Sequence, residues 1–276
     1  MREIQSITLD RARTSKHVDE IFAERRSEFE RVLLRLANRS DQTAKPPVND
    51  PSFPNAGIAM RCTGVPLVPV RVDRLTERED LRIGTRPVRV TSAANPSQES
   101  GISCYENIDP RQFQPALRGW SYVFEPPRAE VYNSMLVRWD GEIERVFCDL
   151  MTRTEQPGRG MRGVQFNSLL AFVLSTATSI EVFRSRTGTQ EVPYELEFDL
   201  IANPEGRLDT PDSESRAESY TFETRRTIFP RFLLGHPESI KAIGDYLQAD
   251  ILNAANQSTR RFYQFDTAAS LRLHER

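Results

Sequence analysis

The chain has 276 residues, of which 38% are hydrophobic and 28% are charged, and its formal net charge is −2. This is enough for one large domain with a real core, or for such a domain with a helical appendage. The near-neutral charge requires no polyanionic partner, although only three of the 37 basic residues are lysines. Codon usage in a GC-rich genome explains this excess of arginine, and so does selection for planar, bidentate contacts with phosphate or carboxylate. Composition does not separate the two explanations.

The cysteine content and the charged start of the chain predict a cytoplasmic protein. Cys62, Cys104 and Cys148 lie more than forty residues apart, so no pair has metal-ligand spacing, and their odd number argues against a disulfide framework. We therefore expect reduced thiols. We expect no secretory signal, because charged residues interrupt the start of the chain. The segment Val164–Ile180 contains no ionisable residue, but its polar side chains favour a buried core helix over a membrane span.

The first forty residues predict a helical segment. Met1–Leu9 predicts a short helix, and Ser15–Asn38 predicts a longer amphipathic helix with carboxylates in its first turn. At 100° per residue, one arc of about 120° holds the apolar side chains of this longer helix. These side chains are Val18, Ile21, Phe22, Phe29, Val32, Leu33 and Leu36. Arg25 falls within the same arc and interrupts its apolar character.

A change in composition and periodicity separates this helical segment from the rest of the chain. Residues 39–56 hold four prolines and show no periodicity, which is typical of a linker or an irregular loop. The expected organisation is a helical segment over 1–40, a linker over 41–56 and an α+β domain over 57–276. The helical segment begins as though another element should precede it, so we expect a truncated start.

Short segments beyond the linker predict strands and two further helices. The Asp-Gly pair at 140–141, between two alternating runs, predicts a hairpin. Strands are expected over 57–75, as one long or two short ones, and over 87–91, 120–124, 131–139, 142–151, 191–201 and 220–228. Helices are expected over 164–184 and 237–256, and polar loops over 92–113 and 203–216. Because strands come in runs rather than alternating with helices, the fold class is α+β, with a mixed, largely antiparallel sheet.

No catalytic or metal-binding motif is recognisable in the sequence. His17, His236 and His274 lie at two helix starts and at the end of the chain, and none has a Ser, a Cys or another His at motif spacing. We interpret them as surface or capping residues. Arg159 and Arg162 belong to the glycine-rich segment GRGMRG before a helix, which can hold an anion. A flexible turn explains this segment as well, because no Lys-Ser/Thr follows it.

An acidic strand offers a second candidate. Glu195, Glu197 and Asp199 alternate with apolar residues, so the three carboxylates share one face of a strand. This pattern predicts a half-solvated strand. A metal site is the alternative, and it needs further ligands from other elements.

Two groups of arginines are candidates for contact with a partner. Arg25, with Arg26 beside it, either extends to water, pairs with a carboxylate or contacts a ligand. Arg260 and Arg261 precede three aromatic residues, Phe262, Tyr263 and Phe265, as cations and aromatics mix on single-strand nucleic-acid surfaces. An edge strand with aromatic residues facing a core explains this second group equally well.

The start of the chain resembles a known arrangement. MREIQSITLDRAR and the IFAERRSEF helix resemble the region that follows the AlbA-type, Schlafen-like domain of bacterial DNA-binding proteins, with Met1–Ile4 and Phe22–Arg26 at the matching positions. The later segments IAMRCTGVPLVPV, LRGW (Leu117–Trp120) and WDGEIERV are also similar. The resemblance covers most of this chain as the C-terminal partner of that family. It implies an association with nucleic-acid or nucleotide (ATP) binding. The glycine-rich domain that carries this binding is absent, so no catalytic residue is carried over.

The sequence therefore predicts a non-enzymatic accessory or regulatory module without a cofactor or a membrane span. It would dock on an AlbA-type domain in cis or in trans, or on a second copy, with Arg25 and Arg26 at the contact. The alternative is a stand-alone nucleic-acid or nucleotide binder, and an unidentified enzyme is the third reading. The residues that would contact nucleic acid or phosphate are Arg159, Arg162, Arg260 and Arg261.

Overall fold

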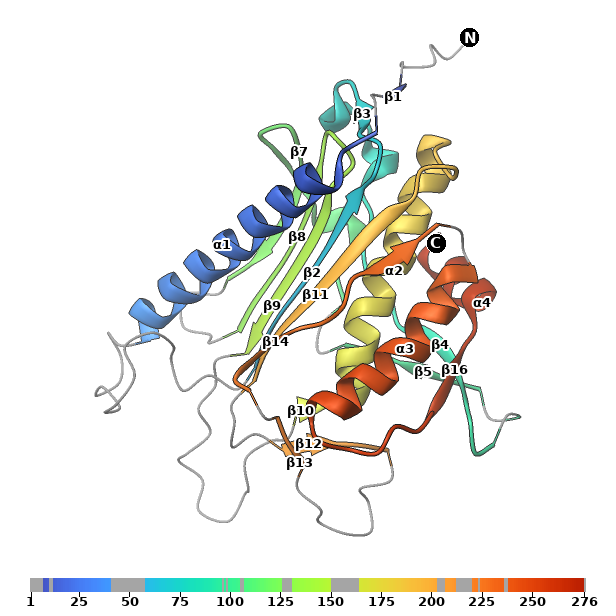
Figure 1. Cartoon of the computed structure of the whole chain (residues 1–276). Coiled ribbons are helices and arrows are strands. Elements are labelled where there is room, and N and C mark those ends of the chain that lie inside the picture. The colour runs from blue at the N-terminus through green and yellow to red at the C-terminus, as the bar shows by residue number, and fades with distance from the viewer. Residues whose placement is uncertain are drawn as a thin grey trace.

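An antiparallel sheet of eight strands forms the centre of the fold, with helices on both of its faces (Figure 1). The computed structural model describes residues 7–9, 12–40, 58–95, 97, 99–104, 107–125, 131–149, 164–202, 207–211, 220–222, 224–235 and 238–275. The strand order is β14-β11-β2-β9-β8-β7-β6, and β15 also pairs with β11. The strands are β2 (Ile58–Pro66), β6 (Gln114–Ala116), β7 (Gly119–Phe124), β8 (Val131–Arg138), β9 (Ile143–Asp149), β11 (Tyr194–Ala202), β14 (Arg226–Ile228) and β15 (Phe232–Leu234).

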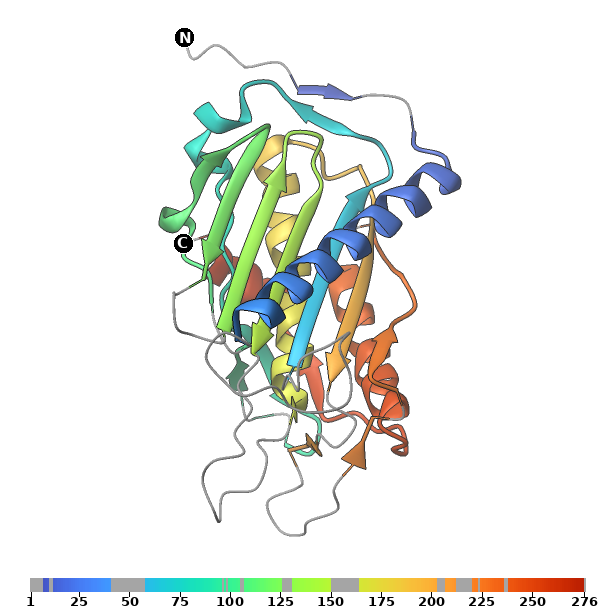
Figure 2. The same ribbon diagram turned by 90° about the vertical axis from the view of Figure 1, so that its left-hand side faces the viewer.

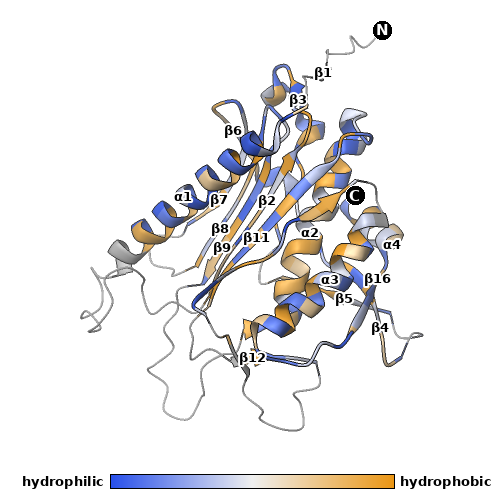
Figure 3. Cartoon of the chain, in the orientation of Figure 1, coloured by the Kyte–Doolittle hydropathy of each residue, from blue (hydrophilic) through white to orange (hydrophobic). Residues whose placement is uncertain are grey.

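One face of the sheet packs on the main hydrophobic core. Helix α2 (Phe166–Thr187) lies along this face, and α3 (Glu238–Ala254) and α4 (Thr267–His274) pack against α2. Figure 3 shows how consistently apolar α2 is. By length and composition α2 could cross a membrane, but 94% of its most apolar window is buried inside the fold. Its composition is therefore that of a core helix, as Val164–Ile180 predicted, and this fits a soluble protein.

Helix α1 (Ser15–Ser40) crosses the opposite face of the sheet on a diagonal (Figure 2). Two apolar clusters fix it there. Val18, Ile21 and Phe22 pack against Val65 of β2 near the start of the helix. Near its end, apolar side chains of α1 pack over β2, β8, β9 and β11; the buried members of this second cluster are Phe29, Leu33, Leu36, Ala59, Tyr132, Val146, Cys148 and Ile201. The stretch of α1 between the two clusters holds the charged residues described below.

Three smaller sheets complete the described part of the chain. β1 (Ile7–Leu9) pairs with β3 (Val70–Val72). A second sheet joins β10 (Val164–Gln165), β12 (Arg207–Asp209) and β13 (Tyr220–Thr221), and a third joins β16 (Tyr263–Phe265), β4 (Val88–Ser92) and β5 (Glu99–Ile102). Three short 3-10 helices span Leu75–Glu77, Glu79–Leu81 and Pro110–Gln112.

The α+β fold class is confirmed, together with most of the long elements. The amphipathic helix predicted for Ser15–Asn38 is α1, and the hairpin predicted around Asp140-Gly141 joins β8 to β9. Gly141 lies there with φ +86°, a conformation that glycine adopts without strain.

Four expectations about local structure are wrong. Ile7–Leu9 was expected within a helix but forms β1, because it pairs with β3, a contact with no local signal. The expected loop over 92–113 contains β5, and the expected loop over 203–216 contains β12. The single strand expected over 220–228 is two short strands, β13 and β14. In each case, pairing with a distant segment overrides local composition. The expected linker over 41–56 lies outside the described residues.

The packing of α1 on its own sheet predicts different costs for two substitutions on this helix. Phe29 is 1% exposed in the second cluster, whereas Leu34 is 45% exposed one turn further on. We expect Phe29→Ala to lower the free energy of unfolding by about 3–5 kcal/mol, because it removes a buried aromatic side chain and leaves a cavity. Leu34→Ala should cost well under half of that. Urea denaturation followed by circular dichroism measures both, and equal losses would mean that α1 does not pack as described.

Candidate functional site

The sheet face beneath α1 carries charged and polar side chains at positions where a sheet usually carries apolar ones. Arg61 and Thr63 of β2 lie on this face between neighbours on both sides. Arg61 pairs in register with Asp199 of β11, and Thr63 lies between Glu197 of β11 and Glu144 of β9. Alternate residues of a strand point to the same face, so the register itself gathers these groups under the helix.

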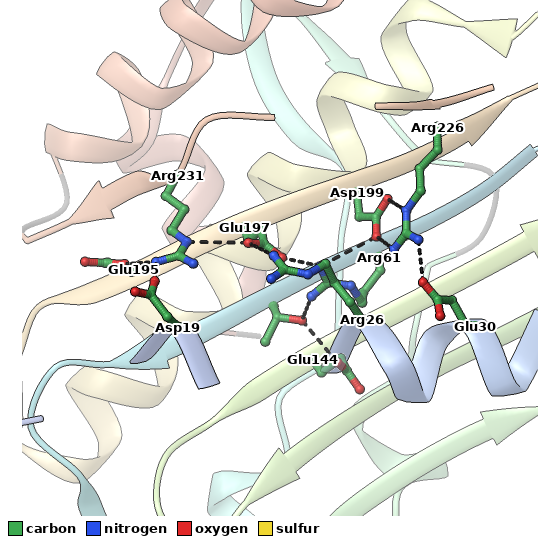
Figure 4. Close-up of polar contacts among 11 residues, drawn as sticks. Asp19, Arg26, Glu30, Arg61, Glu144, Glu195, Glu197, Asp199, Arg226 and Arg231 are labelled. Atoms are coloured by element: carbon green, nitrogen blue, oxygen red, sulfur yellow. Dashed lines mark hydrogen bonds and ion pairs between the residues drawn. The ribbon is translucent and has the colours of Figure 1, made fainter. Parts of the chain in front are cut away.

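Arg61 is the centre of this charged cluster (Figure 4). Its side chain has no exposed surface. It donates to Oε1 of Glu197 at 2.5 Å and to Oγ1 of Thr63 at 2.6 Å, and it lies 3.7 Å from Asp199. A buried guanidinium is tolerable only when carboxylates and hydrogen bonds compensate its lost hydration, and here they do.

Helix α1 adds two arginines to the cluster from above. Arg26 donates to Oε2 of Glu197 at 2.7 Å. Arg25 is 7% exposed and lies 3.2 Å from Glu142, and it also donates to Glu28 of its own helix at 2.7 Å. The interruption of the apolar arc at Arg25 is therefore a buried ion pair within the chain, and its side chain does not extend to water. Arg25 and Arg26 lie where α1 meets the body of the domain.

Arginines from the edge of the sheet close the cluster on the other side of α1. Arg226 of β14 binds Asp199 with both arms of its guanidinium, at 3.1 and 2.7 Å, and reaches Glu30 of α1 at 2.5 Å. Burial lowers the pKa of Arg226, but the hydrogen bonds to Asp199 and Glu30 outweigh it and raise this pKa above its ordinary value. Arg231 contacts Asp19 of α1 at 2.6 Å in the same way.

Glu142, beside Arg25, is a buried carboxylate whose pKa lies well above its ordinary value. Burial and the neighbouring carboxylate of Asp140 raise the pKa of Glu142 from 4.5 to about 7, against the opposing effect of Arg25, Arg13 and Arg138. Arg13 lies 2.8 Å from Asp140 and 3.6 Å from Glu142, so it joins the start of α1 to the turn between β8 and β9.

The acidic strand is placed differently from what its alternation predicts. Glu197 and Asp199 are 2% and 0% exposed, so β11 is not a half-solvated strand. The alternation does bring the carboxylates to one face, but α1 covers that face, and Arg26, Arg61, Arg226 and Arg231 pair with them. Only Glu195, at the end of the row, is half-buried. Among the described residues, no group of three or more His, Cys, Asp or Glu side chains could hold a metal ion.

Of the other arginines singled out in the sequence, Arg260 and Arg261 make contacts outside this cluster. Arg261 pairs with Asp245 at 2.5 Å, and Arg260 lies over the ring of Phe262 at 4.9 Å. The segment after them forms β16, an edge strand with Phe262 and Phe265 buried, as the simpler interpretation of these aromatic residues predicted. Arg159 and Arg162 lie outside the described residues, so the grouping of the four arginines stays a prediction.

The surroundings of His274, Cys62 and Cys148 do not activate these side chains for catalysis. Burial lowers the pKa of His274 to about 4, so it is neutral, and it accepts the backbone N–H of Arg86. His17 is exposed at the start of α1, and His236 lies outside the described residues. Burial raises the pKa of Cys62 to about 12 and raises that of Cys148 as well, so both thiols stay protonated.

A groove runs beside the charged cluster, between α1 and the part of the sheet that α1 leaves open. Its volume is about 370 Å³. One wall is α1 over Glu28–Val32, and the floor is made by β7, β8 and β9. The floor side chains alternate between apolar and polar groups along each strand; they are Ser121, Val123, Ser134, Leu136, Glu144 and Val146.

Sequence reasoning identified Arg25 and Arg26 but missed the groups that surround them. Arg61 carried a usable signal, because it is the one charged residue in the otherwise uncharged segment Ile58–Val65. Arg226 and Arg231 carried none, since only the pairing of β14 and β15 with β11 brings them to the cluster.

No protein-family model, no curated protein and no solved structure matches this chain. The relation to Schlafen-like, AlbA-type proteins therefore stays a prediction from the sequence.

Removing the central guanidinium should be costly. Arg61→Met leaves the carboxylates of Glu197 and Asp199 buried without their main partner, and we expect the free energy of unfolding to fall by about 3–5 kcal/mol. Lys16→Met is the control, because Lys16 is 87% exposed and its contact with Glu20 is 3.8 Å long. This control should change stability little, as exposed ion pairs do. Similar losses for both variants in urea denaturation would contradict the burial of the cluster.

The raised pKa of Glu142 predicts a pH dependence of stability. The folded protein holds this proton more tightly than the unfolded chain, so ionising Glu142 costs free energy as pH rises from 4.5 to about 7. Relative to Glu142→Gln, the free energy of unfolding of the wild type should fall by roughly 3 kcal/mol over that interval. It should not fall further at higher pH. Urea denaturation at stepped pH measures the difference, with Glu20→Gln as an exposed control. If the wild type instead became more stable relative to Glu142→Gln as pH rises, the arginines would be lowering this pKa.

Proposed function

We propose that this protein is a non-enzymatic interaction module that receives a partner segment in the groove between α1 and strands β7 and β8. The observation that carries the proposal is the incomplete cover of one sheet face. Helix α1 crosses that face on a diagonal (Figure 2), and the floor of the groove lies open beside it. Val123 on this floor is 57% exposed, although it lies within a strand of the central sheet.

The chemistry of the groove supports a binding role. Concave sites with mostly apolar linings and a few polar groups are the usual form of binding sites in proteins. Here Phe29 and Val32 line the helical wall, and Leu136 and Val146 line the floor. The rigid elements on both sides hold these side chains in place, because α1 is fixed by the buried ion pairs and the floor belongs to the central sheet.

The charged cluster supports a structural role for itself rather than a catalytic one. Each of its buried arginines contacts at least one carboxylate, and the carboxylates Glu142, Glu197 and Asp199 each contact at least one arginine. Such mutually compensated charges hold a helix in register but leave no reactive group for a substrate. An accessory or regulatory role, as the sequence predicts, fits this arrangement.

The identity of the partner and the cellular compartment follow from the sequence alone. The resemblance to Schlafen-like systems makes an AlbA-type nucleic-acid-binding domain, in cis or in trans, the partner that we propose. Free, buried cysteines are compatible with the reducing cytoplasm. The stand-alone nucleic-acid binder is a weaker candidate, because Arg261 is paired with Asp245 and Arg260 lies on an aromatic ring.

A peptide-display selection tests the groove as the contact surface. The probe is a library of random twelve-residue peptides, selected on the whole immobilised protein, and enriched peptides are then titrated by fluorescence anisotropy. Val123→Glu puts a charge on the exposed floor of the groove, and we expect it to weaken binding at least tenfold. Tyr246→Glu is the matched control, since Tyr246 is 68% exposed on α3, outside the groove. Enriched peptides that bind Val123→Glu as well as the wild type would contradict the proposal.

An oligonucleotide titration of the same purified protein distinguishes the proposed function from the alternative of nucleic-acid binding. Single-stranded and double-stranded oligonucleotides are titrated at low salt with the wild type and with the double variant Arg260→Ala/Arg261→Ala. The proposed function predicts negligible binding of either oligonucleotide. Tight binding that falls steeply with salt and is lost in the double variant would favour the alternative instead.

A further inference from the structure

The carboxylate of Glu144 is the exception to the pairing of charges beneath α1. It lies on the floor of the groove, and Oε2 accepts the hydroxyl of Thr63 at 3.1 Å (Figure 4). Thr63 in turn accepts Arg61 at 2.6 Å, so the hydroxyl proton is directed at Glu144. Among the residues that the structure describes, Glu144 forms no ion pair within 4 Å, unlike the other carboxylates of this face.

The surroundings of Glu144 favour a cation rather than a neutral group as its partner. Arg138, the nearest arginine in the lining, is engaged by Glu28 at 3.2 Å and by Glu142 at 3.6 Å. Burial raises the pKa of Glu144, while Arg61, Arg138 and Arg25 lower it from a distance. A partly desolvated carboxylate without a direct counter-ion gains the most from a charged hydrogen-bond donor.

The strand register determines how long a side chain must be to reach Glu144 from the open side of the sheet. Glu144 lies opposite Leu136 of β8, and Leu136 lies opposite Ser121 of β7. In the next row, Val146 lies opposite Ser134, which lies opposite Val123. Neighbouring strands are about 4.8 Å apart, so roughly 10 Å of floor leads from the open side of the sheet to the carboxylate.

A long cationic side chain matches this floor. The methylene groups of an arginine or a lysine would cover Leu136 and the neighbouring Val146, while the charged end reached Glu144. Apolar neighbours of that residue would also find contacts, because Val123 borders the groove on the open side and Val32 lies on its helical wall. A fork-shaped guanidinium can bind a carboxylate through two hydrogen bonds, which a single ammonium cannot do in the same geometry.

We propose that the groove is a specificity site for an arginine side chain of a partner peptide, with Glu144 as the residue that binds its guanidinium. This inference rests on the proposed function, because it names the chemistry of the segment that the groove receives. Glu144 acts here as a binding residue, and Thr63 positions its carboxylate.

The test uses two capped tripeptides that differ in charge alone. Acetyl-Leu-Arg-Val-amide carries the guanidinium, and the same peptide with citrulline keeps the shape without the charge. Each is titrated into the full chain with labelled methyl groups, and shifts of Val123, Leu136 and Val146 report binding in the groove. We expect the arginine peptide to bind at least tenfold more tightly than the citrulline peptide.

Two variants show whether Glu144 causes that preference. Glu144→Gln should bring the two peptides within about threefold of each other, leave the affinity for the citrulline peptide unchanged and leave methyl shifts outside the groove unchanged. Glu195→Gln is the matched control, because Glu195 is a half-buried carboxylate of the same sheet face on the other side of α1, paired with Arg231. This control should retain the tenfold preference.

The remaining outcomes overturn the inference in distinguishable ways. Equal binding of both peptides in the groove would remove the role of Glu144 and leave the groove as a contact surface. No shift of the groove methyls with either peptide would reject the arginine site, and the display selection would then decide separately whether the groove binds any peptide. Sedimentation that shows self-association of the wild type but not of Val123→Glu would assign the groove to a second copy of the chain.

Discussion

The burial of Arg61 between Glu197 and Asp199 is the constraint on which the rest of this structure depends. A sheet face that carries charged groups in its middle cannot pack against an apolar helix. It needs a helix that carries charged side chains on its sheet-facing side, opposite the charged part of the sheet. Arg25 and Arg26 give α1 that property. The apolar clusters at the two ends of α1 supply most of the burial, and the charged centre sets where along the sheet the helix lies.

This arrangement gives the two faces of the sheet different roles. The face toward α2 packs on the main hydrophobic core that stabilises the domain, and the buried Arg145 of β9 donates to Ser175 of α2 there at 2.9 Å. The face toward α1 is covered only in the middle, because a single helix is narrower than a sheet of eight strands. The open half beside α1 becomes a groove with a rigid wall, and Glu144 lies where the groove meets the charged cluster. The proposed binding role and its preference for a cation both follow from the position of α1.

The sequence predicts the long elements well, because their periodicities are strong and local. The apolar arc of α1, the hairpin at Asp140-Gly141 and the core helix α2, which contains most of the uncharged segment Val164–Ile180, all appear as expected. Even the interruption at Arg25 was visible. Its partner was not, because Glu142 lies 117 residues away and only the folding of the sheet brings it near. The burial of Glu197 and Asp199 was missed for the same reason: alternation in a strand identifies a shared face, but it does not reveal what covers that face.

A double-mutant cycle between Arg26 of α1 and Glu197 of β11 tests the central claim most directly. The free energy of unfolding is measured for the wild type, Arg26→Met, Glu197→Gln and the double variant. If α1 is held across its own sheet by partly buried ion pairs, the two substitutions should couple by about 1–3 kcal/mol in favour of the native pair. A coupling energy indistinguishable from zero would mean that α1 does not lie on this face, and the groove beside it would then lose its wall.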